Sequence, residues 1–175
     1  MDHHDHLRLI RDGVMGAGPA WADLGSGGGA FTLALADLLG PTGRIVSIDR
    51  DASALRRQAE LLRARFPDVA VETRVADFTR QLDLADLDGV VMANSLHFVR
   101  DQGSVLGLVR DVLRDDGRLV IVEYDADHGN PWVPHPISWR RLPALLESAG
   151  FRDARHLASV PSRFLNAIYS AVAVR

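Results

Sequence analysis

The sequence predicts an α/β fold built on a doubly wound, mostly parallel sheet. Apolar runs of strand length alternate with amphipathic segments of helix length, which is typical of βαβ units. Four glycines occupy five positions, Gly25 to Gly29, directly after the first apolar run. Near the C-terminus the alternation stops, and two β-prone runs follow each other with no room for a crossover helix.

Length and composition favour one globular domain. The chain has 175 residues, of which 47% are hydrophobic and 25% charged, so it can bury a sizeable core. We expect a single domain over residues 18–175, preceded by a short N-terminal segment, residues 1–17. No internal repeat is visible.

Composition also excludes several kinds of chemistry. The chain has no cysteine, which rules out disulfides, thiolate metal sites and cysteine nucleophiles. A net charge of −3 predicts no nucleic-acid partner. His3, His4 and His6 with Asp2 and Asp5 suit a frayed polar terminus better than a metal site. Without a signal peptide or a run of about 18 apolar residues, the chain is expected to be cytoplasmic, with no membrane segment.

The first part of the chain predicts five strands, each an apolar run that ends in polar or glycine-rich residues. They are expected near residues 20–24, 44–48, 69–75, 89–93 and 118–124. Helices are expected near residues 7–14, 30–39, 51–65, 79–85, 101–114 and 138–149. Gly40 to Gly43 should end the second of these helices, and Asp115 to Gly117 should turn the chain into the fifth strand.

The last two strands are expected at residues 151–160 and 164–174. Pro161-Ser162-Arg163 joins them, and parallel neighbours would need a connection of about a dozen residues. The two runs should therefore pair antiparallel, as a C-terminal hairpin that completes a sheet of seven strands.

The glycine-rich loop indicates a nucleotide site. Glycine adopts positive φ without steric cost, and the helix expected from Ala30 would direct its free N–H groups towards a bound ligand. The residues fit two patterns. One is Asp23-x-Gly25-x-Gly27-x-Gly29, and the other, Gly25-x-Gly27-x-x-Ala30, is the dinucleotide fingerprint.

With Asp23-x-Gly25-x-Gly27-x-Gly29, the chain resembles the class I S-adenosylmethionine-dependent methyltransferases, whose first motif has this form. The resemblance covers residues 18–175 and implies a Rossmann-like fold with S-adenosylmethionine as cofactor. Asp23 supports it, because a carboxylate attracts the cationic S-adenosylmethionine and would repel a pyrophosphate. The C-terminal antiparallel hairpin is also the arrangement of this family.

The resemblance implies cofactor contacts at four successive strand ends. Asp49 is similar to the acidic residue that binds the ribose hydroxyls, and Asp77 to the one that accepts from the adenine amino group. Residues 94–98 occupy the place beside the methionine part and the reacting methyl. The expected cofactor-binding residues are Asp23, Leu24, Gly25, Ser26, Gly27, Gly29, Asp49, Arg50, Ala76, Asp77, Phe78, Asn94, Ser95 and His97.

His97 is the candidate general base, because it follows the fourth strand and its reference pKa is near neutrality. A structural histidine is the alternative. The segment 127–138 contains three prolines and leaves the fifth strand on the ligand-binding edge, so it is a candidate substrate wall. The expected substrate contacts are Tyr124, Trp132, His135, Arg163 and Tyr169.

The sequence therefore predicts an enzyme that transfers a methyl group from S-adenosylmethionine to a small molecule and releases S-adenosylhomocysteine. Two alternatives stay open, an NAD(P)-dependent oxidoreductase and a non-catalytic S-adenosylmethionine-binding module. Only a short segment precedes the first strand, so the active site is expected to be open or covered by a second subunit of a homodimer.

Overall fold

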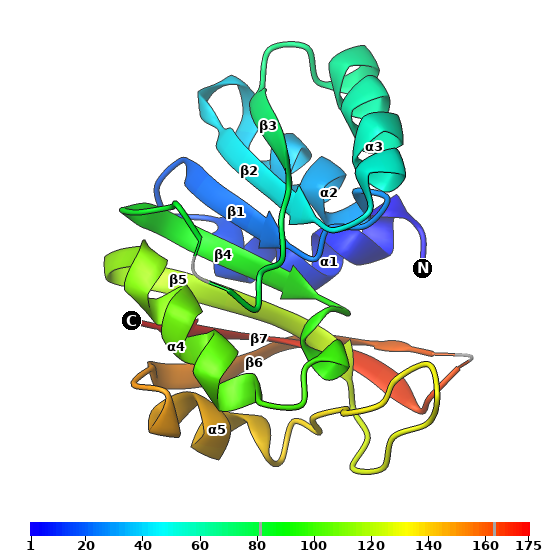
Figure 1. Ribbon diagram of the computed structural model, residues 1–175, viewed down its shortest axis with the longest axis vertical. Coiled ribbons are helices and arrows are strands. Elements are labelled where there is room, and N and C mark those ends of the chain that lie inside the picture. The colour runs from blue at the N-terminus through cyan, green and yellow to red at the C-terminus, as the bar shows by residue number, and fades with distance from the viewer. Residues whose placement is uncertain (81, 163) are drawn as a thin grey trace.

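The computed structural model describes residues 1–80, 82–162 and 164–175, which form a sheet of seven strands with helices on both faces (Figure 1). The strands are β1 (Ala20–Leu24), β2 (Arg44–Asp49), β3 (Ala70–Val75), β4 (Leu87–Ala93), β5 (Leu113–Tyr124), β6 (Arg152–Pro161) and β7 (Ala167–Val174). The helices are α1 (His3–Val14), α2 (Ala30–Leu39), α3 (Ala52–Arg65), α4 (Gln102–Val112) and α5 (Leu142–Ser148), with 3₁₀ turns η1 (Gly40–Thr42) and η2 (Leu96–Phe98).

The strand order is β3-β2-β1-β4-β5-β7-β6. The strands from β3 to β5 are parallel, whereas β7 pairs antiparallel with both β5 and β6. This confirms the predicted α/β sheet with its C-terminal antiparallel hairpin. The order differs from the 3-2-1-4-5-6 arrangement of the dinucleotide-binding fold, because β7 is inserted between β5 and β6.

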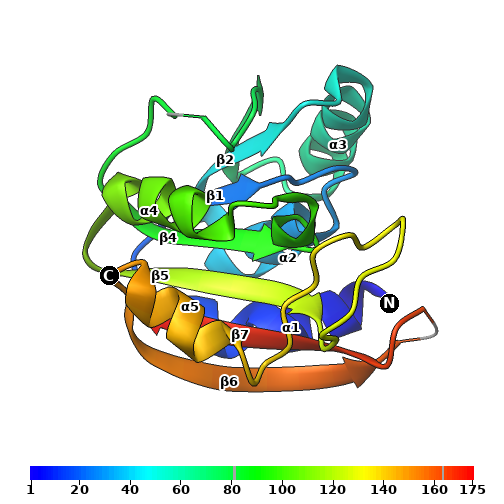
Figure 2. The same cartoon turned by 60° about the horizontal axis from the view of Figure 1, so that its bottom comes forward.

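Both faces of the sheet are buried along its central strands. Along β5, Leu119 and Ile121 belong to the core beneath α4 and α5, while Val120 and Val122 belong to the core on the opposite face. Helices α1, α2 and α3 contribute to that second core, and Figures 1 and 2 show the two groups of helices on opposite sides of the strands. No helix in the described ranges is long and apolar enough to cross a membrane.

Helix α1 corrects the expectation of a frayed N-terminus. It begins at His3 rather than near residue 7, because Asp2 and Asp5 form a capping box in which each carboxylate accepts the other's backbone N–H. Leu9 and Ile10 are fully buried in the core that α1 shares with α2. The first turn of α1 is therefore held at both its cap and its apolar face.

Two other helices differ from the predicted ones. No helix is present in the described part of residues 79–85, because the Asp77 carboxylate accepts the backbone N–H and the hydroxyl of Thr79 and fixes a turn instead. Helix α5 begins at Leu142 rather than near residue 138. Pro143 lies in its first turn, where proline favours a helix start.

The predicted turn at Asp115 to Gly117 lies inside β5. That strand begins at Leu113, directly after α4, and its pairing with β4 shifts register between Leu87 and Gly89. Leu87 pairs with Leu113 and Gly89 with Arg118, so β5 has extra residues between these two pairs. Asp116, with φ 60°, lies among them and forms a bulge-like irregularity. These turn residues therefore bend a strand rather than precede it.

Candidate functional site

The expected cofactor residues gather where the parallel strands end. Strands β1, β2 and β4 are neighbours in the sheet, so their carboxyl ends share one edge. Residues 25–29 follow β1, residues 50–51 follow β2 and residues 94–95 follow β4. Open α/β sheets bind ligands at this edge, next to the strand where the order reverses.

Three glycines of the loop after β1 have positive φ, and two of them, Gly25 and Gly29, leave no space for a side chain. Gly25, Gly27 and Gly29 have φ values of 77°, 51° and 84°. A Cβ on Gly25 would lie 2.5 Å from the Cβ of Ser95. The Gly27 N–H donates to Asp49 Oδ2 at 2.7 Å. The loop therefore keeps its shape through missing side chains and through a carboxylate at the end of β2.

A set of polar side chains lies beneath the glycine loop. The amide of Gln58 donates to Thr32 Oγ1 at 2.6 Å and to Ser47 Oγ at 2.7 Å. Thr32 donates to Asp23 Oδ2 at 2.6 Å, and Ser47 donates to Ser26 Oγ at 2.7 Å. Burial raises the pKa of Asp23 to about 7, although the hydrogen bond from Thr32 acts in the opposite direction. Asp23 thus lies under the loop rather than on its surface.

Sequence reasoning missed Gln58, which is fully buried. Its spacing could have revealed it, because Gln58 lies four residues after Ala54 and four before Leu62, in the apolar stripe that α3 turns towards the core. A polar side chain on such a stripe needs buried partners, since an unpaired one would destabilise the fold.

A first cavity, of about 290 Å³, opens at the ends of β1, β2 and β4. Asp49 and Arg50 line it from β2, and Phe78 lines it from the loop after β3. Asp49 is anchored by the N–H groups of Gly27 and Asp51, at 2.7 and 2.8 Å. The full lining consists of Gly25, Asp49, Arg50, Phe78, Thr79, Asn94, Ser95, Phe98 and Val99.

A second cavity, of about 550 Å³, lies between the glycine loop and the first turn of α1, and it shares Gly25 and Asn94 with the first. Its lining consists of Met1, Asp2, His3, His6, Gly25 to Gly28, Ala30, Phe31, Leu33, Arg65, Ala93 and Asn94. Across the described residues, no three His, Cys, Asp or Glu side chains are placed to hold a metal ion.

Asn94 is the junction of the two cavities. It has φ 52°, an uncommon conformation for a residue other than glycine, and its N–H donates to the Val122 carbonyl at 2.8 Å. Its Oδ1 is buried and has no hydrogen-bond partner among the described residues. The next residue, Ser95, donates its hydroxyl to the Leu24 carbonyl at 2.7 Å. A buried acceptor without a partner favours a ligand that brings a donor.

The loop after β3 brings Phe78, and not the Asp77 carboxylate, to the wall of the first cavity. The Asp77 carboxylate accepts from Thr79 and lies 3.8 Å from the Arg50 guanidinium, and it does not line the first cavity. These hydrogen bonds lower the pKa of Asp77. The neighbouring Phe78 lines the cavity instead, and the Ala76 N–H donates to the Asp49 carbonyl at 3.1 Å. The predicted adenine contact from Asp77 stays a prediction, because Thr79 donates to Oδ1 alone and the Oδ2 atom keeps its acceptor capacity.

His97 is buried against a carboxylate. Its Nδ1 lies 2.7 Å from Glu123 Oε2, and its backbone N–H donates to Glu123 Oε1 at 3.1 Å. The imidazole is 2% exposed, and its ring centroid lies 4.3 Å from that of Phe98 and 5.8 Å from that of Tyr124. His97 thus lies behind the rim of the first cavity, beneath two aromatic side chains.

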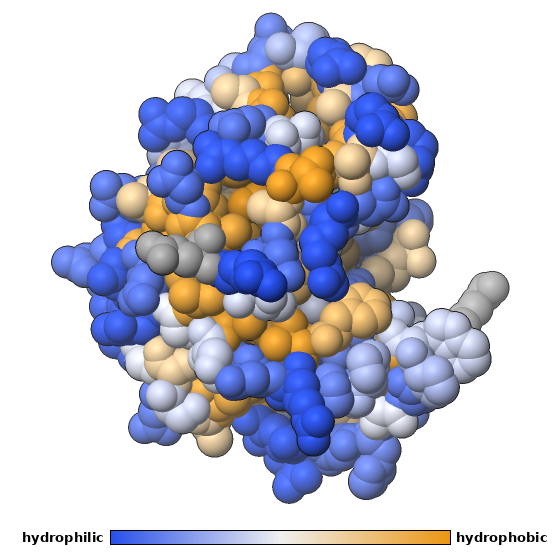
Figure 3. Space-filling model, viewed as in Figure 1, coloured by the Kyte–Doolittle hydropathy of each residue, from blue (hydrophilic) through white to orange (hydrophobic). Residues whose placement is uncertain are grey.

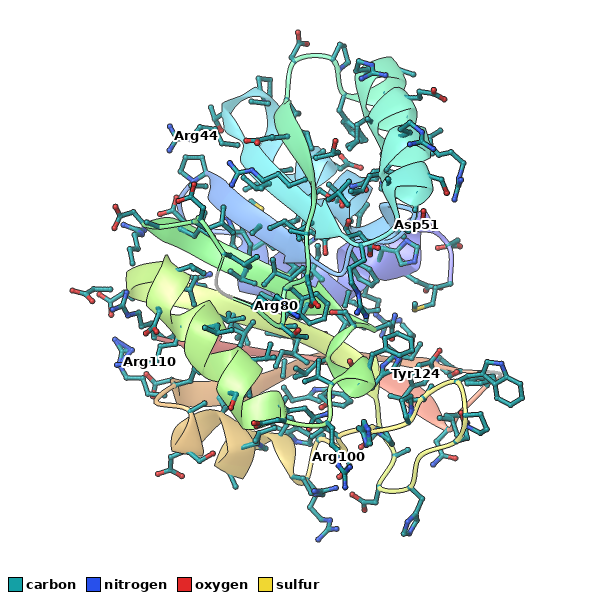
Figure 4. The ribbon with its side chains drawn as sticks, viewed as in Figure 1. Arg44, Asp51, Arg80, Arg100, Arg110 and Tyr124 are labelled. Atoms are coloured by element: carbon teal, nitrogen blue, oxygen red, sulfur yellow. The ribbon has the colours of Figure 1, made fainter. Side chains whose placement is uncertain are left out.

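Exposed aromatic side chains continue from this rim along the edge of the sheet. Phe98, Trp132 and Phe164 are 59%, 69% and 49% exposed. The Phe164 ring lies 5.9 Å from Tyr124 and 6.0 Å from Trp132, between ring centroids. Figure 4 labels Tyr124 near the carboxyl end of β5, and Figure 3 shows apolar surface over the region of η2. Phe164 thus joins Tyr124 to Trp132 at this edge, and their contacts with a substrate stay predictions.

The remaining substrate candidates are not placed together. Tyr169 is 1% exposed, and its hydroxyl donates to the Ile137 carbonyl at 2.8 Å, so its predicted substrate contact is wrong. The His135 side chain is exposed, and its backbone N–H donates to the His97 carbonyl at 3.0 Å, which ties the segment 127–138 to the loop after β4. Arg163 lies outside the described residues.

Comparisons with known proteins agree with this geometry. A family model described as "Methyltransferase domain" matches residues 18–150. An uncharacterised 37.1 kDa protein of transposon TN4556 from Streptomyces fradiae is 34% identical over 111 residues, which are 63% of this chain and 31% of that protein. The match thus spans about a third of the curated relative.

Solved structures share the fold over nearly the whole chain. A SAM-dependent methyltransferase from Aquifex aeolicus has a TM-score of 0.75 at 20% identity, over 97% of this chain and 89% of the other. EvdMO1 has a TM-score of 0.73 at 27% identity, over 99% and 41%. Magnesium protoporphyrin IX methyltransferase from Synechocystis PCC 6803, solved with bound SAM, has a TM-score of 0.74 at 16% identity, over 98% and 76%.

Proposed function

The chain belongs to the methyltransferase-domain family, and we propose that it transfers a methyl group from S-adenosylmethionine to a small-molecule acceptor. The observation that carries this proposal is the unpaired, buried Oδ1 of Asn94 at the junction of the two cavities. S-adenosylmethionine brings an ammonium group to this position if its nucleoside occupies the first cavity and its methionine part the second.

The residues of the first cavity suit a nucleoside. Asp49 offers a carboxylate to the ribose hydroxyls, since each of its oxygens accepts one backbone N–H and retains a further lone pair. Phe78 offers an aromatic face for the adenine ring. We assign adenine packing to Phe78 and leave Asp77 as the residue that shapes its turn.

Asp23 acts from beneath the loop. Its carboxylate is held by Thr32 and has a pKa of about 7, so a nearby cation favours its ionised form. The ammonium and sulfonium groups of S-adenosylmethionine would favour the ionised Asp23 carboxylate, whereas the negative charge of a pyrophosphate would disfavour it. This distinguishes the proposed cofactor from a dinucleotide.

Positioning supplies much of the catalysis that such a site needs. The cofactor brings an electrophilic methyl group with a good leaving group, and correct alignment of reactants contributes about 7–11 kcal/mol in model reactions. His97, the candidate base, is 2% exposed and lines neither cofactor cavity nor the cavity beside Tyr124. Its contact with Glu123 favours the alternative, a structural histidine.

The acceptor is proposed to bind beside the exposed aromatic side chains. A cavity of about 580 Å³ is lined by Met1, Asp5, Tyr124, Pro161, Ser162, Phe164 and Ile168. Its volume is typical of small-molecule sites, which measure about 300–1,000 Å³. Structural neighbours include the N-terminal domain of EvdMO1, crystallised in the presence of SAH and D-fucose.

Calorimetric titration with S-adenosylhomocysteine tests the cofactor site. The wild-type chain should bind, and Asp49→Asn should weaken binding at least about tenfold, because charged hydrogen bonds contribute about 1.5–3 kcal/mol. Asp51→Asn is the matched control. Asp51 starts α3 (Figure 4), does not line either cavity, and asparagine caps helices as well as aspartate does. Equal binding by the two variants would contradict the assignment of Asp49.

The alternatives give different results in two assays. Thermal stabilisation by NAD(H) or NADP(H), with none by S-adenosylhomocysteine, would indicate an oxidoreductase. Incubation with methyl-labelled S-adenosylmethionine and a cell extract should place label in the small-molecule fraction. Label in RNA or protein would contradict the proposed acceptor class, and tight cofactor binding without any transfer would indicate a binding module.

A further inference from the structure

We propose that His6, on α1, binds the carboxylate of the cofactor's methionine part. The inference rests on the proposed function, because it assumes that S-adenosylmethionine occupies the two cavities. It gives the N-terminal helix a binding role that its sequence did not suggest.

His6 is placed at the second cavity by a rigid element. It lines that cavity together with the glycine loop, and its ring lies 4.8 Å from that of Phe31, between centroids. The capping box of Asp2 and Asp5 fixes the turn that carries it, and Ile10, one turn further on, is fully buried. A side chain held in this way loses little freedom when a ligand binds.

The lining of the second cavity contains both acceptors and donors. A methionine group needs acceptors for its ammonium and donors for its carboxylate. Asn94 Oδ1 supplies an acceptor beside the glycine loop. From α1, an imidazole can donate an N–H, and no side-chain hydrogen bond joins His6 to another described residue.

Two polar neighbours of His6 on α1 have partners of their own. His3 Nε2 lies 2.9 Å from the Asp37 carboxylate. The Asp2 carboxylate accepts the Asp5 N–H at 2.9 Å. Arg65, at the end of α3, also lines the cavity, and its contact with the Phe66 ring does not use its N–H donors. Among the histidines of α1 that line the cavity, His6 is therefore the one whose ring nitrogens have no hydrogen bond to a described residue.

Calorimetry with two ligands tests the inference. S-adenosylhomocysteine carries the carboxylate, and its decarboxylated analogue keeps the nucleoside, the sulfur and the amine. His6→Ala should weaken S-adenosylhomocysteine about tenfold and the analogue less than about twofold, since the lost interaction is a charge-assisted hydrogen bond. His4→Ala is the matched control, because His4 is an exposed histidine of the same turn that does not line the cavity. It should change neither affinity.

His6→Phe keeps a ring against Phe31 and should show the same selective loss. Unchanged affinity for S-adenosylhomocysteine in both His6 variants, or an equal loss for both ligands in both variants, would overturn the inference. A wild-type chain that binds neither ligand would instead refute the proposed function, so the two failures are distinguishable.

Discussion

Asp23 shows how one residue can serve both the fold and the site. Its carboxylate is 1% exposed and accepts a 2.6 Å hydrogen bond from Thr32, which is itself held by Gln58. A buried carboxylate without a cationic partner destabilises the folded chain when it ionises. The same carboxylate becomes favourable when a cationic ligand lies above the loop. In the proposed site, the free protein thus loses stability at Asp23 that a cationic ligand would restore.

This arrangement makes the stability of the free protein depend on pH. The pKa of Asp23 is raised from 3.8 to about 7, so the folded state binds more protons than the unfolded state between these values. The contribution to stability is therefore full below about pH 4 and is lost as the pH rises towards about 7. Asp23→Asn stays neutral and should gain stability relative to wild type by a few kcal/mol over this range.

Urea unfolding at about pH 5 and about pH 8 measures this difference. Other carboxylates, such as Asp51 and Asp127, have lowered pKa values and affect both proteins alike. Only the difference between wild type and Asp23→Asn is therefore informative. Parallel stability curves for the two proteins would refute an ionisable carboxylate with a raised pKa.

Sequence reasoning identified residues whose role follows from a strand end, and it failed where the role depends on a partner far along the chain. Asp49 ends β2, Asn94 directly follows β4, and both line the first cavity as expected. The Tyr169 side chain points to the buried face of β7, because side chains alternate along a strand and the register with β5 fixes which of them face the core. Gln58 acquires its role only when α3 packs over Thr32 and Ser47.

At the scale of elements, the glycine loop yields a sharp test. Gly29 has φ 84°, and a Cβ there would lie 2.3 Å from the Cγ of Gln58. Gly29→Ala should destabilise the fold by about 1–3 kcal/mol, because it combines backbone strain with a clash in the buried network. Thermal or urea unfolding measures the change.

Gly28→Ala is the control from the same loop. Its φ is not positive, and a Cβ added there would have no atom within 4 Å beyond its own chain neighbours. Its stability should stay within about 0.5 kcal/mol of wild type. Similar losses for the two variants would show that the loop responds to any added methyl group rather than to the contact with Gln58.

The elements themselves were predictable where local signals were unambiguous. Asp51 caps α3 through the N–H groups of the next turn, and that helix starts within one residue of the prediction. Two predictions were wrong for a common reason: the helix expected near residues 79–85, and the start of α1 expected near residue 7. In both places short-range hydrogen bonds from aspartates, Asp77 and Asp2, decide the backbone, and apolar spacing does not reveal them.

At the scale of the molecule, topology determines where the site lies. The antiparallel insertion of β7 between β5 and β6 was predictable from the short connection between the last two strands. The two cavities were not, because the second requires α1 to lie across the glycine loop. Together they form the proposed cofactor site, in which strand ends line the cavity assigned to the nucleoside and the N-terminal helix lines the cavity assigned to the methionine part.

A crystal structure of the chain with bound S-adenosylhomocysteine tests this account most directly. It should show the ribose at Asp49, the adenine against Phe78 and the amino group within hydrogen-bond distance of Asn94 Oδ1. A ligand bound elsewhere on the chain, or one whose amino group leaves Asn94 without a partner, would contradict the account.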